Sequence, residues 1–320
     1  MKKVLIITAV LAAVAISVLI LLIGCSQTVD VTEVFNAFSG KDDKAPVLLG
    51  AHSESSATVR LDFSEPVKLY GSYVGKYSAR SEGKSIYIVL PSELEPGIQT
   101  QISGRVRDHA GNTCAFSIQV WGLNPRLPKI LINEFTTKGS DKSPDRTELR
   151  ILGDGNLNGM VLYNGIPDDW DSRVLFPDID VRKNDLVVIW WTEELPQAAE
   201  EASGVINICA SCSDSLSSNN GTLVLCDTPS IGATVIDAVI YSNFSSSYQG
   251  FGTKGALQRA QWVQDYGAWS GDAIDSTSST ATRSVSRFSD GRDTDSAGDW
   301  FITVTGGSTF GTENTSDPYS

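Results

Sequence analysis

Short segments in which apolar and polar residues alternate recur along this chain, with turn residues between them. In an extended strand, the segment Thr58–Phe63 places Val59, Leu61 and Phe63 on one face. The same alternation recurs at Ile86–Leu90 and at Phe116–Val120. Proline and glycine turns interrupt these segments, and regular amphipathic helices are hard to find. The sequence therefore predicts an all-β fold made of two β-sandwich domains.

The composition favours folded domains with an acidic surface. Hydrophobic residues make up 41% of the chain and there are seven tryptophans, which is too apolar for a disordered segment. The formal net charge is −13. An acidic surface repels phosphate backbones, so we expect no nucleic-acid partner.

The first 25 residues carry the parts of an export signal. Lys2 and Lys3 precede an apolar run from Val4 to Ile23, which ends in Gly24-Cys25. This ending resembles the lipobox of bacterial lipoproteins. The resemblance implies that residues 1–24 are a signal peptide and that Cys25 is lipid-modified, which holds the protein to a membrane of the cell envelope, outside the cytoplasm. The alternative is an uncleaved anchor helix, because about 20 apolar residues can span a bilayer.

The rest of the chain divides by composition. Residues 25–44 are the lipidated cysteine and a mostly polar tether, and residues 45–122 form the first predicted domain. Residues 123–128 contain two prolines and predict a semi-rigid linker. Residues 129–315 form the second predicted domain, and residues 316–320 are a tail.

The first domain resembles the bacterial Ig-like domains of surface proteins. The matching segments are Pro46, Phe63–Val67, Leu94–Gly97 and the Asp108–Asn112 turn, which is similar to the "D-x-A-G-N" turn of that family. Glycine and asparagine tolerate a positive φ, so a tight hairpin there has a physical reason. The resemblance implies a spacer or an adhesive module.

The second domain resembles the bacterial form of the lamin-tail domain, which is an Ig-like β-sandwich. The matching segments follow the family order: Ile132-Asn133-Glu134, Glu148-Leu149, Gly159–Leu162, Ile236–Tyr241, Ser286–Phe288 and Asp299–Phe301. Asn184 stands where the family commonly has glycine, and asparagine allows the same turn. Residues 244–280 do not fit the family pattern, and Thr305-Gly306-Gly307 replaces its usual Thr-Pro-Gly.

Two groups of carboxylates are candidate cation ligands. Glu134 and Glu148 would bind a cation together if their strands are neighbours, but we favour a structural role in which each caps a turn or pairs with an arginine such as Arg287. Four aspartates in one glycine-containing loop offer the oxygen ligands that Ca²⁺ prefers, although Asx-turns are the commoner use of such residues. These four are Asp290, Asp293, Asp295 and Asp299.

The cysteines favour a disulfide over zinc. Cys209 and Cys212 form a C-x-x-C pair, but together with Cys226 they lack the fourth ligand that a structural zinc site needs. Disulfides, in contrast, persist outside the cytoplasm. We predict that Cys226 pairs with Cys209 or Cys212, and that Cys114 is buried and free.

Catalytic residues are not predicted. Both histidines, His52 and His109, lie in the first domain, which excludes histidine-based triads from the second. If Trp190 and Trp191 lie on a strand, they point to opposite faces, and the outward one is the better ligand contact. The remaining tryptophans of this domain are expected in the core, among them Trp170, Trp262 and Trp269.

The sequence therefore predicts a membrane-anchored, extracytoplasmic lipoprotein that acts as a non-enzymatic binding or scaffold module. Its partners would be the membrane, through the lipid, and an unidentified protein or glycan. The first alternative is a targeting subunit of an extracytoplasmic nuclease or hydrolase system. The second is a carboxylate-metal enzyme that uses Glu134, Glu148 or the loop from Asp290 to Asp299.

Overall fold

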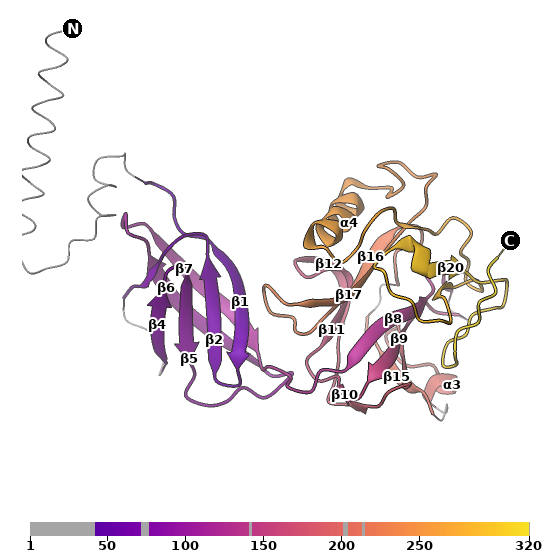
Figure 1. Ribbon diagram of the computed structural model, residues 1–320, viewed down its shortest axis with the longest axis horizontal. Helices are drawn as coiled ribbons and strands as arrows, with labels where there is room; N and C mark the ends of the chain where they lie inside the picture. Colours follow the sequence, from indigo (N-terminus) through magenta and orange to yellow (C-terminus); the bar gives the residue numbers. More distant parts are fainter. Residues whose placement is uncertain (1–41, 72–76, 141–142, 201–203, 213–214, 320) are drawn as a thin grey trace, which may run out of the picture.

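The structure is a computed structural model that describes residues 42–71, 77–140, 143–200, 204–212 and 215–319. The predicted signal peptide, Cys25 and most of the tether lie outside the described residues. The described chain is all-β, as predicted, with two β-rich units joined by a short connection (Figure 1). Within the described residues, no helix has the length and apolar character needed to cross a bilayer.

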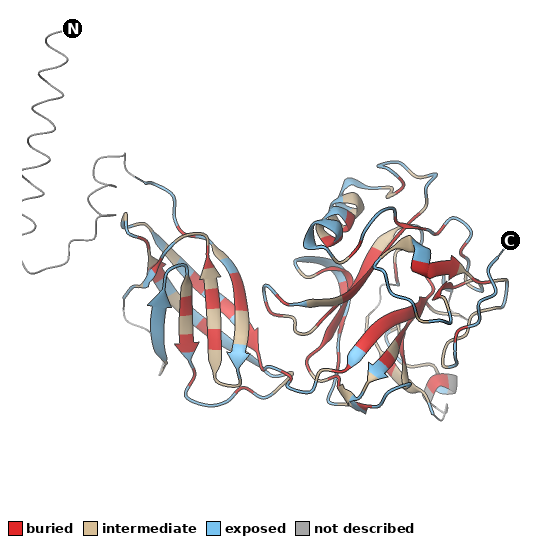
Figure 2. Ribbon diagram, in the orientation of Figure 1, coloured by how far each residue is buried: buried red, intermediate tan, exposed pale blue. Residues whose placement is uncertain are grey.

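The first unit is a small sandwich of two antiparallel sheets. One sheet contains, in spatial order, β1 (Leu48–Ser55), β2 (Thr58–Phe63), β5 (Ser85–Val89) and β4 (Ser78–Glu82). The other contains β3 (Lys68–Leu69), β6 (Gln99–Arg107) and β7 (Thr113–Trp121). The predicted alternation is confirmed, because Val59, Leu61 and Phe63 are buried and the residues between them are half-exposed. Figure 2 shows this banding along the strands.

The β6–β7 hairpin has the turn that its sequence predicts. Gly111 has a φ of 99°, which an L-residue rarely adopts. The Asp108 carboxylate accepts hydrogen bonds from the backbone N–H groups of Gly111 and Asn112, at 2.6 and 2.8 Å. This is an Asx-type turn that fixes the hairpin register.

The second unit also packs two main sheets over one core. The six-stranded sheet contains, in spatial order, β15 (Ile206–Cys209), β14 (Leu186–Trp190), β9 (Arg146–Gly153), β8 (Lys129–Phe135), β19 (Val285–Arg287) and β20 (Trp300–Ile302). The five-stranded sheet contains β12 (Asp169–Leu175), β11 (Val161–Ile166), β16 (Gly221–Cys226), β17 (Val235–Ser242) and β18 (Ile274–Asp275). A short pair, β10 (Gly155–Asn156) and β13 (Asp180–Val181), lies beside them. The core between the sheets is separate from that of the first unit.

In the described residues, helices occur in the connections between strands. The short α3 (Gln197–Glu200) precedes β15, and the 3-10 turn η1 (Ala297–Asp299) precedes β20. The longer α4 (Lys254–Tyr266) lies in the segment that does not fit the lamin-tail pattern. Thr253 caps its first turn, and Gly267 ends it with a φ of 87°. Asn184 has a φ of 77°, so it forms the turn for which glycine is common in that family.

The joint between the two units is hydrogen-bonded. The Asn124 amide donates to the backbone carbonyls of Asn156 and Asn158, at 2.8 and 2.9 Å. The loop between β16 and β17 reaches toward the first unit (Figure 1), where the backbone N–H of Ala51 donates to the carbonyl of Ile231 at 2.8 Å. A side-chain contact of the linker and a backbone contact of the β16–β17 loop therefore hold the two units together.

Candidate functional site

Glu134 and Glu148 lie directly opposite each other on β8 and β9, and both are fully buried. The register confirms that their strands are neighbours. Burial raises the pKa of Glu134, and it raises that of Glu148 to about 7, with the nearby Glu134 adding to the effect. The two carboxyl groups are therefore electrostatically coupled through burial on neighbouring strands.

Both carboxylates bind the C-terminal loop. Glu134 accepts hydrogen bonds from the Ser284 hydroxyl and from the N–H and hydroxyl of Thr309, while Glu148 accepts one from the N–H of Gly311 at 2.6 Å. The Asn133 amide donates to Glu148 as well, at 2.7 Å. These contacts are turn caps, which is the structural role favoured from the sequence.

Beside this pair, an open groove lies between β14, β15 and the C-terminal loop. It has a volume of about 140 Å³ and an apolar wall that includes Val188 and Val205. The Arg146 guanidinium lies 5.0 Å from the Trp190 ring centre and 4.0 Å from that of Phe310. All three side chains are half-buried. We call this the Trp190 groove.

The structure decides which of the two adjacent tryptophans faces outward. Trp191 is 2% exposed and donates its indole N–H to the Thr147 hydroxyl at 2.9 Å. Trp190 lines the groove, and its indole N–H is held by the Asn207 amide oxygen at 2.8 Å. The Arg146 Nε is buried and has no hydrogen-bond partner among the described residues. The groove therefore presents an oriented ring beside a cation.

The predicted aspartate loop is organised around an arginine. Arg287 is 2% exposed, and its guanidinium lies 2.9 Å from Asp293, 3.4 Å from Asp237 and 3.6 Å from Asp299. It also donates to the backbone carbonyl of Ile132 at 3.1 Å. We call this the Arg287 cage. Its positive charge stands among the carboxylates as a bound cation would.

The four candidate calcium ligands have different partners. Asp290 pairs with Arg292, and Asp299 accepts hydrogen bonds from the Thr294 backbone and hydroxyl. Carboxylate oxygens of Asp293, Asp295 and the unpredicted Asp237 lie within 4.8 Å of one another. Calcium binding by the loop stays a prediction, and the dependence of the melting temperature on Ca²⁺ would test it.

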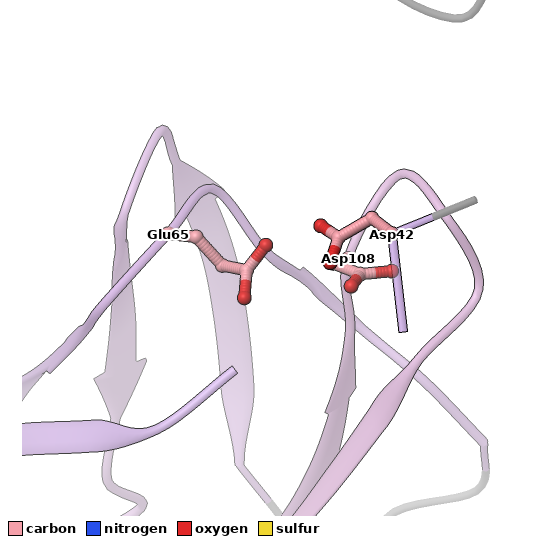
Figure 3. Close-up of side chains that lie close together, drawn as sticks. All are labelled: Asp42, Glu65 and Asp108. Atoms are coloured by element: carbon pink, nitrogen blue, oxygen red, sulfur yellow. The ribbon is translucent and has the colours of Figure 1, made fainter. Parts of the chain in front are cut away.

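A second acidic cluster lies at the end of the first unit that carries the β6–β7 turn. Asp42, Glu65 and Asp108 converge from three separate segments (Figure 3). Burial raises the pKa of Glu65, and the two aspartates add to the effect. Asp108 is already used by the hairpin turn, and the Asn112 amide bridges it to the backbone of Asp42. These hydrogen bonds thus join the segment at Asp42 to the β6–β7 turn.

The predicted disulfide is not formed in the structure. Cys226 is a buried free thiol at the end of β16, whereas Cys209 is a free thiol at the edge of the other main sheet. The Cys209 thiol donates to the backbone carbonyl of Thr192 at 3.1 Å. Cys212 also contacts Thr192, through its backbone N–H. Cys114 is half-buried rather than buried, because it lies on an edge strand.

The histidines and the remaining tryptophans have other surroundings. His109 is exposed, and His52 lies 3.5 Å from Asp62 at the joint. Trp269 is buried as expected, whereas Trp170 is 41% exposed, so the core prediction was wrong for Trp170. Trp170 lies on β12, the edge of the five-stranded sheet, where the Arg173 guanidinium lies 4.8 Å from its ring centre.

A family model described as a protein second domain, TP_1001_2nd, matches residues 128–302. This match spans more than half of the chain. The chain belongs to the TP_1001_2nd family. No curated protein matches it, and no solved structure matches it. The TP_1001_2nd match ends before the C-terminal loop, so Phe310 and Gly311, which complete the Trp190 groove, lie outside the matched residues.

Sequence reasoning missed Arg146 and Phe310 as members of a site. Arg146 begins β9 and Phe310 lies far along the chain in a loop, so no local spacing connects them. The available signal was Glu148, because a buried glutamate on a strand needs donors from elsewhere. A glycine-rich segment near the C-terminus is suited to bring its backbone N–H groups close to such a carboxylate.

Proposed function

We propose that this protein is a membrane-anchored, extracytoplasmic lipoprotein that binds a partner protein through the Trp190 groove. In this proposal, Cys25 carries the lipid, the first unit is a spacer, and the second unit is a binding module related to lamin-tail domains. The family motifs quoted for that relationship fall on β8, β9, β11, β17, β19 and β20. The protein needs no catalytic residue for this role.

The observation that carries the proposal is the grouping of Trp190, Arg146 and Phe310 around an open, apolar groove. Tryptophan and arginine are the residues most enriched among those that dominate binding energy at protein interfaces. A partner side chain in this groove would cover the apolar wall, and a partner oxygen would accept a hydrogen bond from the unpaired Nε–H group of Arg146. An apolar or aromatic side chain next to an acidic group has the matching chemistry.

The joint supports the spacer role. Since Asn124 and the Ala51–Ile231 contact connect the units at two places, the first unit holds the second in a set orientation. A module held in this way keeps one orientation relative to the first unit, and less orientational freedom is lost on binding.

Cross-linking in intact cell envelopes tests the groove. A photo-reactive residue in place of Val205 should form a cross-link to one partner, and Trp190→Ala should abolish it. Trp170→Ala is the matched control, because Trp170 is more exposed but lies on the other sheet. If Trp190→Ala leaves the cross-link unchanged, the groove is not the binding site.

The anchor has its own test. Labelled palmitate should enter the wild-type protein, and Cys25→Ala should prevent this while both units stay folded. Incorporation into the Cys25→Ala protein would contradict the lipid anchor and restore the uncleaved-helix alternative.

A further inference from the structure

The insertion that follows β17 contains a cavity that the proposed function does not use. It lies between α4, the end of β17 and the loop 244–252, and its volume is about 210 Å³. Its floor is formed by buried residues, among them Ser242, Ala260 and Ala273. Its rim carries the exposed side chains of Gln249 and Gln261. We call it the insertion cavity.

A buried hydroxyl in the floor has no partner. Ser242 is 0% exposed, and its Oγ makes no hydrogen bond within the described residues. Its backbone carbonyl is already used, because it accepts from Ser276 at 2.9 Å. A buried hydroxyl without a partner is unfavourable, so this atom marks a position where a ligand atom would be stabilised.

The loop above the floor has an unusual backbone. Tyr248 and Gln249 are consecutive non-glycine residues with φ values of 49° and 57°, and Gly250 follows with 94°. A Cβ on Gly250 would lie 2.4 Å from the Ser242 Oγ, so only glycine allows the loop this close to the floor. Such conformations cost free energy, and they cluster at ligand sites.

The lining chemistry suits a neutral ligand rich in hydroxyl groups. The carboxamides of Gln249, Gln261 and Gln264 each carry donors and an acceptor, and Asp272 accepts. Hydroxyl groups both donate and accept, so they match this set. No lysine, arginine or histidine is among the described residues that line the cavity, and Asp272 would repel an anion.

The volume of the insertion cavity and the side chains at its opening restrict the class of ligand further. A cavity of about 150 Å³ accommodates benzene, so about 210 Å³ accommodates a six-membered ring with substituents. Phe244, which is 54% exposed, and Phe251 add rigid apolar surface at the opening. We propose that the insertion cavity binds one neutral sugar residue, with a ring hydroxyl directed to the Ser242 Oγ.

Saturation-transfer NMR with a panel of free neutral mono- and disaccharides tests this, using the full chain in a detergent that contains no sugar. At least one sugar should bind at millimolar concentration. Ser242→Ala should weaken its affinity about fivefold, the effect of one hydrogen bond. Gln261→Leu on the rim should weaken it as well.

A matched control is available on the neighbouring strand. Thr222 is 1% exposed, its hydroxyl is also without a partner among the described residues, and it does not line the cavity. Thr222→Val should leave the affinity for sugar unchanged. No binding across the panel, or an equal loss in Thr222→Val, would overturn the proposal. Trp190→Ala should not alter sugar binding, so the two sites can fail independently.

Discussion

Replacing Arg287 by methionine should destabilise the second unit strongly. Methionine fills a similar volume but leaves Asp237 buried without its counter-charge, beside Asp293 and Asp299. Removing one partner of a buried ion pair costs about 3–5 kcal/mol. Whole domains are stable by only about 5–15 kcal/mol, so Arg287→Met should remove a fifth or more of the free energy of unfolding.

The assay is urea unfolding followed by tryptophan fluorescence, with a double-mutant cycle. Asp237→Asn in the Arg287→Met background removes the uncompensated carboxylate, so the double variant should be more stable than Arg287→Met alone. The loss in Arg287→Met should also be smaller at about pH 5 than at about pH 8, because a lone Asp237 then binds a proton. A loss below about 1 kcal/mol at the higher pH, against the 3–5 kcal/mol above, or strict additivity in the cycle, would refute the reasoning.

Three further outcomes are expected. The free energy of unfolding should fall as pH rises from about 4 to 7. Burial raises the pKa values of Glu148 and Asp237 to about 7, so the native state holds protons that the unfolded chain releases. Higher urea midpoints at alkaline pH would contradict this. Burial raises the pKa of the Cys226 thiol, so peptide mapping should find it modified by maleimide only after denaturation; a requirement for reductant would instead reveal a disulfide. Gly232 has a φ of 78° and abuts the first unit, so Gly232→Val should enlarge the radius of gyration in small-angle scattering, whereas Gly83→Val, in an open turn, should not.

The strands could be predicted from the sequence because their pattern is local. Alternation along β2 reports burial on one face directly, and a turn such as Asp108–Asn112 carries its own hydrogen-bond donors and acceptors. The same holds for Asn184, whose positive φ depends on its own side chain. Each of these features depends on residues fewer than about ten positions apart, which is the range of such signals.

The site could be predicted only in part because its members are distant in sequence. The sequence left open whether Glu134 caps a turn or pairs with an arginine such as Arg287; in the structure β19 directs Arg287 to Asp237, and Glu134 caps the C-terminal loop. Strand order decides this choice, and it has no local signal. The ends of α4 are marked by Thr253 and Gly267, but its buried face is narrow, because Ala260 and Val263 are its buried residues.

The contact between Ala51 and Ile231 has a consequence for self-association. β1 is the edge of its sheet, and an uncovered edge is a template on which a second copy can add a strand. The opposite edge, β4, is fully exposed but carries the charged pair Arg80 and Glu82, which disfavours such pairing. The hydrogen bond from Ala51 to the second unit thus occupies part of the less charged edge, so a fragment that ends after the first unit should dimerise more readily than the whole chain.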